Sequence, residues 1–378
     1  CIRDRSQTRD EVSVSVSVLT AAESEAAFGV PMALLGIQPV WIELENRTDT
    51  RYLFLPIDVD PDYFTPFELA WKYPNLAAGD TFEARGTFFR EHHIEVRIPA
   101  RSKRSGFVFT QLDRGAKAID IELIGGRASK HFHFVLEVPG LRADYLQLDW
   151  ASIYPADAYQ ELEDFTQLRE VLARLPGHVL GGDRSTAGDP LNLAIIGQPR
   201  QLLFPLIHRG WDLTEIVHGA AVWETIKSSL LGRYYRHSPI SPMYLFGRSQ
   251  DIALQKARSS VDERNHLRLW LAPFRLQGRQ VFIGQISRDI GIKLSSKTLI
   301  THKIDPEVDE ARDYLIQDLF RSGFVSAFGY VSGVGSSIPG EPRFNYTRDP
   351  YWTDGLRAVF IMAEDPLPLS EIKLLGWE

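Results

Sequence analysis

Hydrophobic and polar residues alternate along much of the first third of the chain. The segment EVSVSVSVL places Val at every second position from Val12 to Val18, which predicts a strand with one buried side. QPVWIELENRTDTRYLFL predicts two strands joined by a turn at Asn46, Asp49 and Thr50. Further strands are expected at HHIEVRI, RSGFVFTQLD, KAIDIELIG and KHFHFVLEV, and a short helix at AAESEAAFG. Short strands punctuated by Gly, Pro and Asn predict an all-β sandwich over residues 12–145, with an immunoglobulin-like arrangement.

One of these strands carries a pair of histidines. In KHFHF, His131 and His133 share one face of the predicted strand, and Phe132 and Phe134 share the other. Two histidines at this spacing can ligate a metal if a third ligand comes from elsewhere. We favour the alternative, in which the histidines face solvent beside a buried aromatic face.

The pattern changes near residue 145. Residues 146–188 are expected to connect two domains, with an amphipathic helix at DAYQELEDFTQLREVLARL and a loop over residues 176–190. From residue 189 to 378, helices are expected at QPRQLLFPLIHRG, AAVWETIKSSLLG and DPEVDEARDYLIQDLFRSG. Strands are expected at LNLAIIG, WDLTEI, MYLFG, DIALQK, HLRLWLAPF, RQVFIGQIS, SSKTLITHKI, FVSAFGYV and LRAVFIM. This mixture predicts an α+β domain with a mostly antiparallel sheet.

Composition limits the classes of partner. The chain has 378 residues, of which 44% are hydrophobic and 24% charged, and this fits a globular protein of two domains. The formal net charge is -7, and no run of Lys and Arg interleaved with aromatics occurs, so we expect no nucleic-acid partner. No apolar stretch approaches the ~20 residues that a membrane-spanning helix needs.

The single cysteine is residue 1. Because mature bacterial lipoproteins begin with a lipid-modified cysteine, we expect Cys1 to be lipidated and residues 1–11, which are mostly polar, to form a solvated tether. Two or three acyl chains, at ~0.8 kcal/mol per buried methylene, give firm anchoring. Ile2 favours the outer membrane over the inner one, so the expected protein is exported and faces the periplasm. The alternatives are a chain that begins here for another reason and a free surface thiol.

Six motifs of the second half occur together and in a fixed order. They are GDPLNLAIIG, RGW, SPISPMYLFGRSQDIALQK, HLRLW, ITHKIDPEVDEARDYLIQDL and DPYWTDGLRAVFIM. Together they resemble the LssY C-terminal domain family over residues ~160–365. In that family the domain is often fused to integral-membrane domains of the DedA or phosphatidic-acid phosphatase type, whereas here a β-domain stands in their place. The resemblance implies a membrane-proximal envelope module and no particular reaction.

Polar residues in these motifs suggest two kinds of chemistry. His302 precedes Asp305, Asp309 and Asp313, whose spacing places three carboxylates along one side of a helix, and Arg312 can pair with Asp309. Histidine with carboxylates can bind a divalent cation or act as a base and its orienting group in hydrolysis. The candidate catalytic residues are His266, His302, Asp305 and Asp309. The alternative is that Asp305 and Pro306 simply lead from a strand into a helix.

A second set consists of candidate binding residues. His266, Arg268 and Trp270 share one face of the strand in NHLRLW, and Arg248 and Asp251 flank a glycine-containing turn. The full set of candidate binding residues is Arg248, Asp251, Arg268, Trp270, Asp289, Trp352 and Asp354. The alternative for the charged members is a buried ion network that fixes the register of the sheet.

Three functions remain open at this level. The chain has no G-x-S-x-G, Walker A or H-E-x-x-H motif and no second cysteine. We therefore expect a noncatalytic envelope lipoprotein, an accessory or scaffold subunit that docks on a membrane or periplasmic complex and needs no cofactor. The alternatives are a membrane-surface hydrolase of lipid or phosphate esters, with which a divalent metal is compatible, and a binder of a lipid or small molecule.

Overall fold

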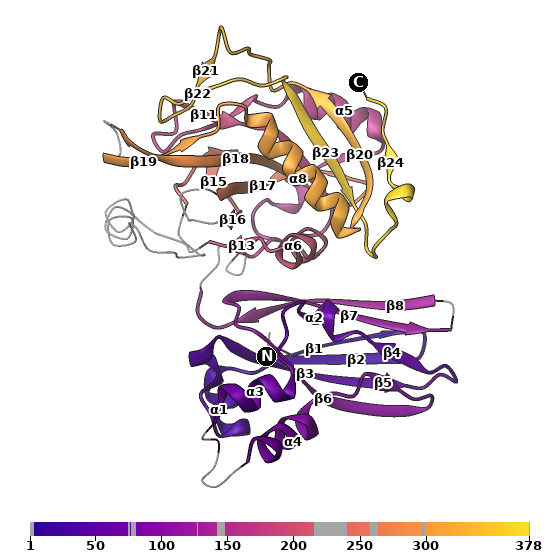
Figure 1. Ribbon diagram of the computed structural model, residues 1–378. Helices are drawn as coiled ribbons and strands as arrows, with labels where there is room; N and C mark the ends of the chain where they lie inside the picture. Colours follow the sequence, from indigo (N-terminus) through magenta and orange to yellow (C-terminus); the bar gives the residue numbers. More distant parts are fainter. Residues whose placement is uncertain are drawn as a thin grey trace. The chain divides into compact units, whose positions relative to one another are not determined.

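The computed structural model divides the chain into two compact units, Cys1–Leu141 and Arg142–Glu378, which are described separately (Figure 1). It describes residues 4–74, 76, 81–126, 128–141, 148–214, 240–257, 264–295 and 299–377. Cys1, the expected lipidation site, lies outside these residues, as does the expected helix AAVWETIKSSLLG.

The N-terminal unit contains two four-stranded antiparallel sheets. The first has the order β1 (Asp4–Arg9), β2 (Val12–Val18), β3 (Ile37–Asn46) and β6 (Ser102–Gln111). The second has the order β5 (Arg97–Ile98), β4 (Tyr52–Phe54), β7 (Gly115–Gly125) and β8 (Ala128–Val138). Both sheets contribute to one buried core, for example through Val14, Ile42, Ile121 and Phe132. The two sheets thus share a core as in a sandwich, and an immunoglobulin-like arrangement stays a prediction.

Short helices form a second core in this unit. They are α1 (Ala21–Phe28), η1 (Met32–Leu35), α2 (Pro56–Val59), α3 (Pro66–Lys72) and α4 (Phe82–His92). Phe28, Leu69 and Phe89 come from three of these helices and pack with Phe109 of β6. The helix expected at AAESEAAFG is confirmed, and Thr20 caps it in a capping box with Glu23.

Two expectations for the N-terminal unit are wrong. Residues 4–9 are not a solvated tether, because they form β1 and pair with β2 along its full length. Hydroxyl groups on the two strands bond to each other, with 2.8 Å between Oγ of Ser6 and Oγ of Ser15. HHIEVRI is not a single strand either: its first residue ends α4, and only Arg97–Ile98 pair as β5.

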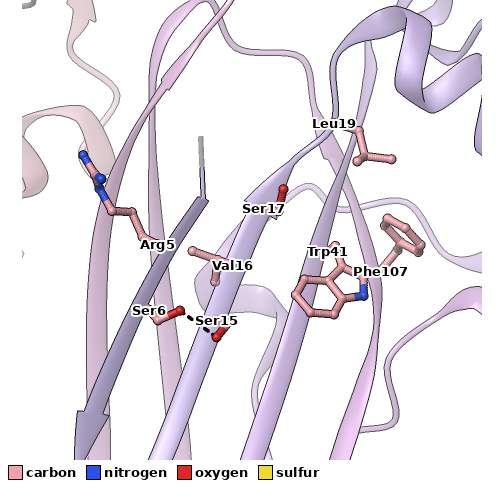
Figure 2. A pocket seen from close by; sticks show the side chains of 8 residues that line it. All are labelled: Arg5, Ser6, Ser15, Val16, Ser17, Leu19, Trp41 and Phe107. Carbon is pink, nitrogen blue, oxygen red and sulfur yellow. Dashed lines mark hydrogen bonds between the residues drawn. The ribbon is translucent and has the colours of Figure 1, made fainter. Parts of the chain in front are cut away.

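A surface hollow lies along the first sheet of the N-terminal unit. Figure 2 shows Trp41 and Phe107 on neighbouring strands, with serine hydroxyls beside them on β1 and β2. The hollow encloses about 520 Å³ and is lined by Arg5, Ser6, Ser15, Val16, Ser17, Leu19, Trp41 and Phe107. It gathers aromatic rings and hydroxyl groups but no cluster of titratable side chains.

The C-terminal unit is built on a ten-stranded, mostly antiparallel sheet. Its main order is β13 (Asp212–Leu213), β16 (Ile252–Ala257), β17 (Arg264–Leu276), β18 (Arg279–Ser295), β12 (Leu193–Ile196), β23 (Leu356–Met362), β20 (Val325–Ser332) and β24 (Lys373–Leu374). Beside this path, β19 (Leu299–Ile304) pairs with β18, and β9 (Gln160–Leu162) pairs with β17. Smaller sheets contain β10 (His178–Leu180), β11 (Ala187–Pro190), β14 (Tyr244–Leu245), β15 (Arg248–Ser249), β21 (Arg343–Phe344) and β22 (Pro350–Tyr351). The predicted α+β fold is confirmed.

Helices cover both faces of the large sheet. α8 (Val308–Ser322) lies across one face together with α6 (Pro199–His208), and Figure 1 shows α8 in front of β18. α5 (Phe165–Arg174) covers the other face, where its Leu168 and Leu172 pack in one core with Trp270 and Ile283. Because both faces are covered, β17 is buried along nearly its whole length. Other short helices among the described residues are η3 (Ala156–Ala158) and η4 (Leu369–Glu371).

The connecting region differs from its prediction. The expected long helix is α-helical only in α5: its first two residues lie in the 3-10 helix η3, and Gln160–Leu162 form β9 and pair in parallel with β17. The expected loop over residues 176–190 contains the antiparallel strands β10 and β11. Among the described helices, none has the length and apolar character needed to cross a membrane.

Candidate functional site

Arg248 and Asp251 form a closed ion pair next to a break in the sheet. The guanidinium makes two hydrogen bonds to the carboxylate, at 2.9 and 2.8 Å. Asp251 also accepts the backbone N–H of Leu271 at 2.6 Å, and Arg248 donates to the carbonyl of Leu271 at 2.5 Å. The β17–β18 register shifts after Leu271, so this pair satisfies backbone groups where the regular ladder is interrupted. The Tyr154 hydroxyl accepts a hydrogen bond from Arg248 and donates one to the carbonyl of Leu271 at 3.0 Å.

A second ion network joins α8 to the loop before β23. Arg312 donates to both carboxylate oxygens of Asp354 at 2.8 Å and lies 3.2 Å from Asp309, as the spacing of Asp309 and Arg312 predicts. Asp309 accepts hydrogen bonds from the Thr353 hydroxyl at 2.9 Å and from the backbone N–H of Asp354 at 2.6 Å. Burial raises the pKa of Asp309, whereas the hydrogen bond from Arg312 helps to lower the pKa of Asp354. The network fixes the DPYWTDG segment on the helix.

Trp352 and Asp305, two further candidates, also make contacts at the start of α8. The indole N–H of Trp352 donates to Glu307, the residue before α8. Asp305 precedes the helix rather than lying on it, and its carboxylate accepts the backbone N–H of Glu307 at 3.2 Å. The expected stripe of three carboxylates along α8 is therefore wrong at its first member. His302 lies on β19 opposite Ile292, and its side chain is outside the described part of the structure.

His266 lies on β17 in a fully buried polar environment. Its Nε2 is 2.6 Å from Oδ2 of Asp289 on β18, and the Nε–H of Arg264 approaches the same nitrogen at 3.1 Å. Arg264 also donates to Oε1 of Gln255 at 2.7 Å. Burial, reinforced by the two neighbouring arginines, holds the pKa of His266 well below its usual range, so the imidazole is neutral near pH 7.

Arg268 and Trp270 continue this line of side chains. Residues 266, 268 and 270 share one face of β17, as predicted from the alternation of the strand, and Gln285 is the cross-strand neighbour of Arg268. Arg268 donates to Oε1 of Gln285 at 2.8 Å. We call His266, Arg268, Trp270 and Gln285 the polar row. Their exposed fractions are 4%, 5%, 0% and 0%.

Each residue of the polar row has a buried polar atom without a hydrogen-bond partner. These atoms are Nδ1 of His266, Nε of Arg268, Nε1 of Trp270 and Nε2 of Gln285. Buried polar groups in proteins nearly always find a partner, and an unsatisfied one costs about 1–3 kcal/mol. The four atoms belong to neighbouring positions of β17 and β18.

Asp189 and Arg357 are among the buried charged residues that the sequence pattern did not single out. Asp189 on β11 is charge-coupled to Arg268 and accepts a hydrogen bond from Asn345 at 2.9 Å, and burial raises its pKa. Arg357 on β23 is fully buried and donates to carbonyls at or near the C-terminal end of α5, including that of Pro176 at 3.0 Å. Burial lowers the pKa of Arg357 to about 10. The signals were an aspartate in GDPLN and an arginine in RAVFIM, each inside an apolar run.

Two of the candidate catalytic residues, His266 and Asp309, lie on opposite faces of the sheet. Lys256 and Arg288 reach residues of α8, with Lys256 Nζ 2.9 Å from Asp318 and Arg288 3.6 Å from Glu310. His266 lies directly across from Gln255 of β16 and from Ser287 of β18. These two residues come immediately before Lys256 and Arg288 in the sequence. Because side chains alternate along a strand, His266 points to the face opposite α8 and Asp309.

Histidines also meet carboxylates in the N-terminal unit. His131 and His133 share one face of β8, as predicted, and lie opposite Glu122 and Asp120 of β7. The His133–Asp120 contact is 3.1 Å and the His131–Glu122 contact 3.7 Å. The expectation that this face is open to solvent is wrong for His133, which is 8% exposed. Within the described residues of either unit, no three His, Cys, Asp or Glu side chains are grouped so that they hold a metal ion.

The C-terminal unit is thus a mixed, mostly antiparallel sheet covered on both faces, with a buried polar row on one face. Residues 174–356 match the family model described as the LssY C-terminus. The predicted resemblance to this family is confirmed over these residues of the C-terminal unit. A comparison with curated proteins found no match.

Proposed function

We propose that the chain is a noncatalytic accessory protein of the bacterial cell envelope. In this proposal a lipid attached to Cys1 holds the protein on a membrane that faces the periplasm, the outer membrane by preference. The N-terminal unit and the C-terminal unit present surfaces to a membrane or periplasmic complex.

The observation that carries the noncatalytic role is the separation of His266 from Asp309 by the thickness of the sheet. A general base and its carboxylate partner must come within hydrogen-bond reach of one substrate. Asp309 and Asp354 are instead engaged with Arg312, and Asp251 with Arg248. These ion pairs stabilise the fold, and they leave His266 and Asp309 without a shared reaction centre.

Fractionation of cells that express the full gene tests the envelope role. The wild-type protein is expected in the membrane fraction with the mass of acyl chains on its N-terminal peptide, and Cys1→Ser is expected in the soluble periplasmic fraction. Ser6→Ala, a similarly small change on β1, serves as the control and should stay on the membrane. In situ crosslinking of the anchored protein should then give a defined heteromeric product. An unmodified N-terminal peptide, or a monomer that crosslinks to nothing, contradicts the proposal.

A further inference from the structure

The hollow of the N-terminal unit lies on the outer face of its first sheet. Ser17, Trp41 and Phe107 are direct neighbours across β2, β3 and β6, so their side chains stand next to each other on one face. Val18 and Ile42, the next residues along β2 and β3, are buried in the core that the two sheets share. Because side chains alternate along a strand, Ser17 and Trp41 point away from that core. The two aromatic rings of the hollow thus belong to the outer side of the sheet.

The aromatic side of the hollow is built from Leu19, Trp41 and Phe107. Leu19 and Phe107 pack against the core of the short helices, which bounds the hollow there. Trp41 is half-buried and belongs to neither core of this unit, so its indole presents a ring surface to the hollow (Figure 2). The face of an aromatic ring is negative and attracts C–H groups, which carry a small positive charge. This side of the hollow therefore suits a ligand with an apolar C–H surface.

Hydroxyl groups line the other side of the hollow. They belong to Ser6 on β1 and to Ser15 and Ser17 on β2. Oγ of Ser6 lies 2.8 Å from Oγ of Ser15, and this bond uses one of the two hydroxyl hydrogens. Since a hydroxyl donates one hydrogen bond and accepts two, the pair keeps a donor and several acceptor positions for a ligand. This side suits a ligand that carries hydroxyl groups of its own.

The charge and size of the hollow narrow the class of ligand further. Of the lining residues only Arg5 is ionisable, and it is exposed to solvent, so the hollow favours an uncharged molecule. A fatty acyl chain would cover the serine hydroxyls without giving them hydrogen bonds, which costs free energy. The volume of about 520 Å³ lies within the roughly 300–1,000 Å³ of small-molecule sites. These features together call for an uncharged ring with a C–H face and a hydroxyl edge.

We propose that this hollow binds a pyranose sugar with equatorial hydroxyl groups, of which glucose is the simplest. In such a ring the hydroxyls point outward around the edge, and the axial C–H bonds form two apolar faces. One face stacks on Trp41, and hydroxyls at the edge exchange hydrogen bonds with Ser6 and Ser15.

The test measures saturation transfer by NMR from the full chain to the C–H protons of glucose, cellotriose and sorbitol. We expect saturable transfer to glucose and to cellotriose, its β-linked trimer. Sorbitol carries the hydroxyl groups of glucose on an open chain without a ring face, so no saturable transfer is expected. Tighter binding of cellotriose identifies a polysaccharide as the source of the ligand, and equal or weaker binding identifies free sugar.

Two variants with matched controls link the effect to the hollow. Trp41→Ala should abolish saturable transfer, whereas Trp71→Ala removes a 79% exposed indole on α3, outside the hollow, and should change nothing. Ser15→Ala should weaken the apparent affinity about fivefold, as expected for the loss of one hydrogen bond. Ser13→Ala removes a hydroxyl from the same face of β2, where it lies 2.9 Å from that of Thr8, and should leave the affinity unchanged.

Three results would overturn the proposal. They are the absence of saturable transfer to either sugar in the folded wild-type protein, equal saturable transfer to sorbitol, and an unchanged affinity in either Trp41→Ala or Ser15→Ala. If Trp41→Ala does not fold, Ser15→Ala decides. Because the readout is sugar binding in solution, it is independent of the membrane fractionation that tests the envelope role.

Discussion

Replacing Arg312 with Met should destabilise the C-terminal unit severely. The Arg312 side chain is 3% exposed and makes two hydrogen bonds to Asp354 at 2.8 Å, one to the carbonyl of Leu356 at 3.0 Å and a 3.2 Å contact with Asp309. Its guanidinium also lies 5.2 Å from the ring of Tyr330. The substitution leaves two carboxylates beside α8 without their cation.

The cost follows from the burial of this network. Removing one partner of a buried ion pair costs about 3–5 kcal/mol, because the remaining charge stays desolvated. Replacing the whole network with neutral groups costs far less. The triple variant Arg312→Met, Asp309→Asn, Asp354→Asn should therefore recover more than half of the lost free energy of unfolding.

Urea unfolding at neutral pH, followed by near-UV circular dichroism, measures these differences. Arg321→Met on the exposed side of the same helix is the matched control and should change the free energy of unfolding by no more than about 0.5 kcal/mol. A loss below about 1 kcal/mol for Arg312→Met would refute the reasoning, because only exposed ion pairs contribute so little. A triple variant less stable than the single one would do the same.

Further predictions concern other parts of the chain. Burial and neighbouring carboxylates raise the pKa of Asp58 to about 6, so its contribution to stability is present below pH ~4 and is lost as pH rises through about 6. Urea unfolding of Asp58→Asn should show a gain of about 1 kcal/mol at pH 7.5, after allowance for solvent screening, and none at pH 4; equal changes at both would contradict it. Gly355 has φ +85°, and an added Cβ would lie 2.6 Å from the backbone nitrogen of Ser336, so Gly355→Ala should cost about 2–4 kcal/mol in the same assay. The NMR signals of the His266 ring should not move between about pH 5.5 and 8, and a titration near 6.5 would show an exposed imidazole.

Most strands of the C-terminal unit could be predicted because their apolar runs are unambiguous. LNLAIIG, HLRLWLAPF and LRAVFIM all lie in strands at the centre of the sheet. The helix predicted at DAYQELEDFTQLREVLARL is too long, since Gln160–Leu162 pair with β17 as β9. That pairing joins residues more than a hundred positions apart, and no local pattern contains it.

The candidate site could be predicted only in part. Alternation along one strand correctly placed His266, Arg268 and Trp270 on one face. Which face α8 covers depends on the order of strands in the sheet, so the separation of His266 from Asp309 had no local signal. Gln285 became visible only as the cross-strand neighbour of Arg268.

The central claim is that the C-terminal unit has no catalytic centre built from His266 and Asp309. The most direct test measures hydrolysis of phosphate-monoester and lipid-ester substrates by the full chain with added divalent metal, for the wild type, His266→Gln and Asp309→Asn. The account predicts either no saturable turnover at all or turnover that both variants retain. Saturable turnover that disappears in both variants, while each still unfolds cooperatively in urea, would contradict it.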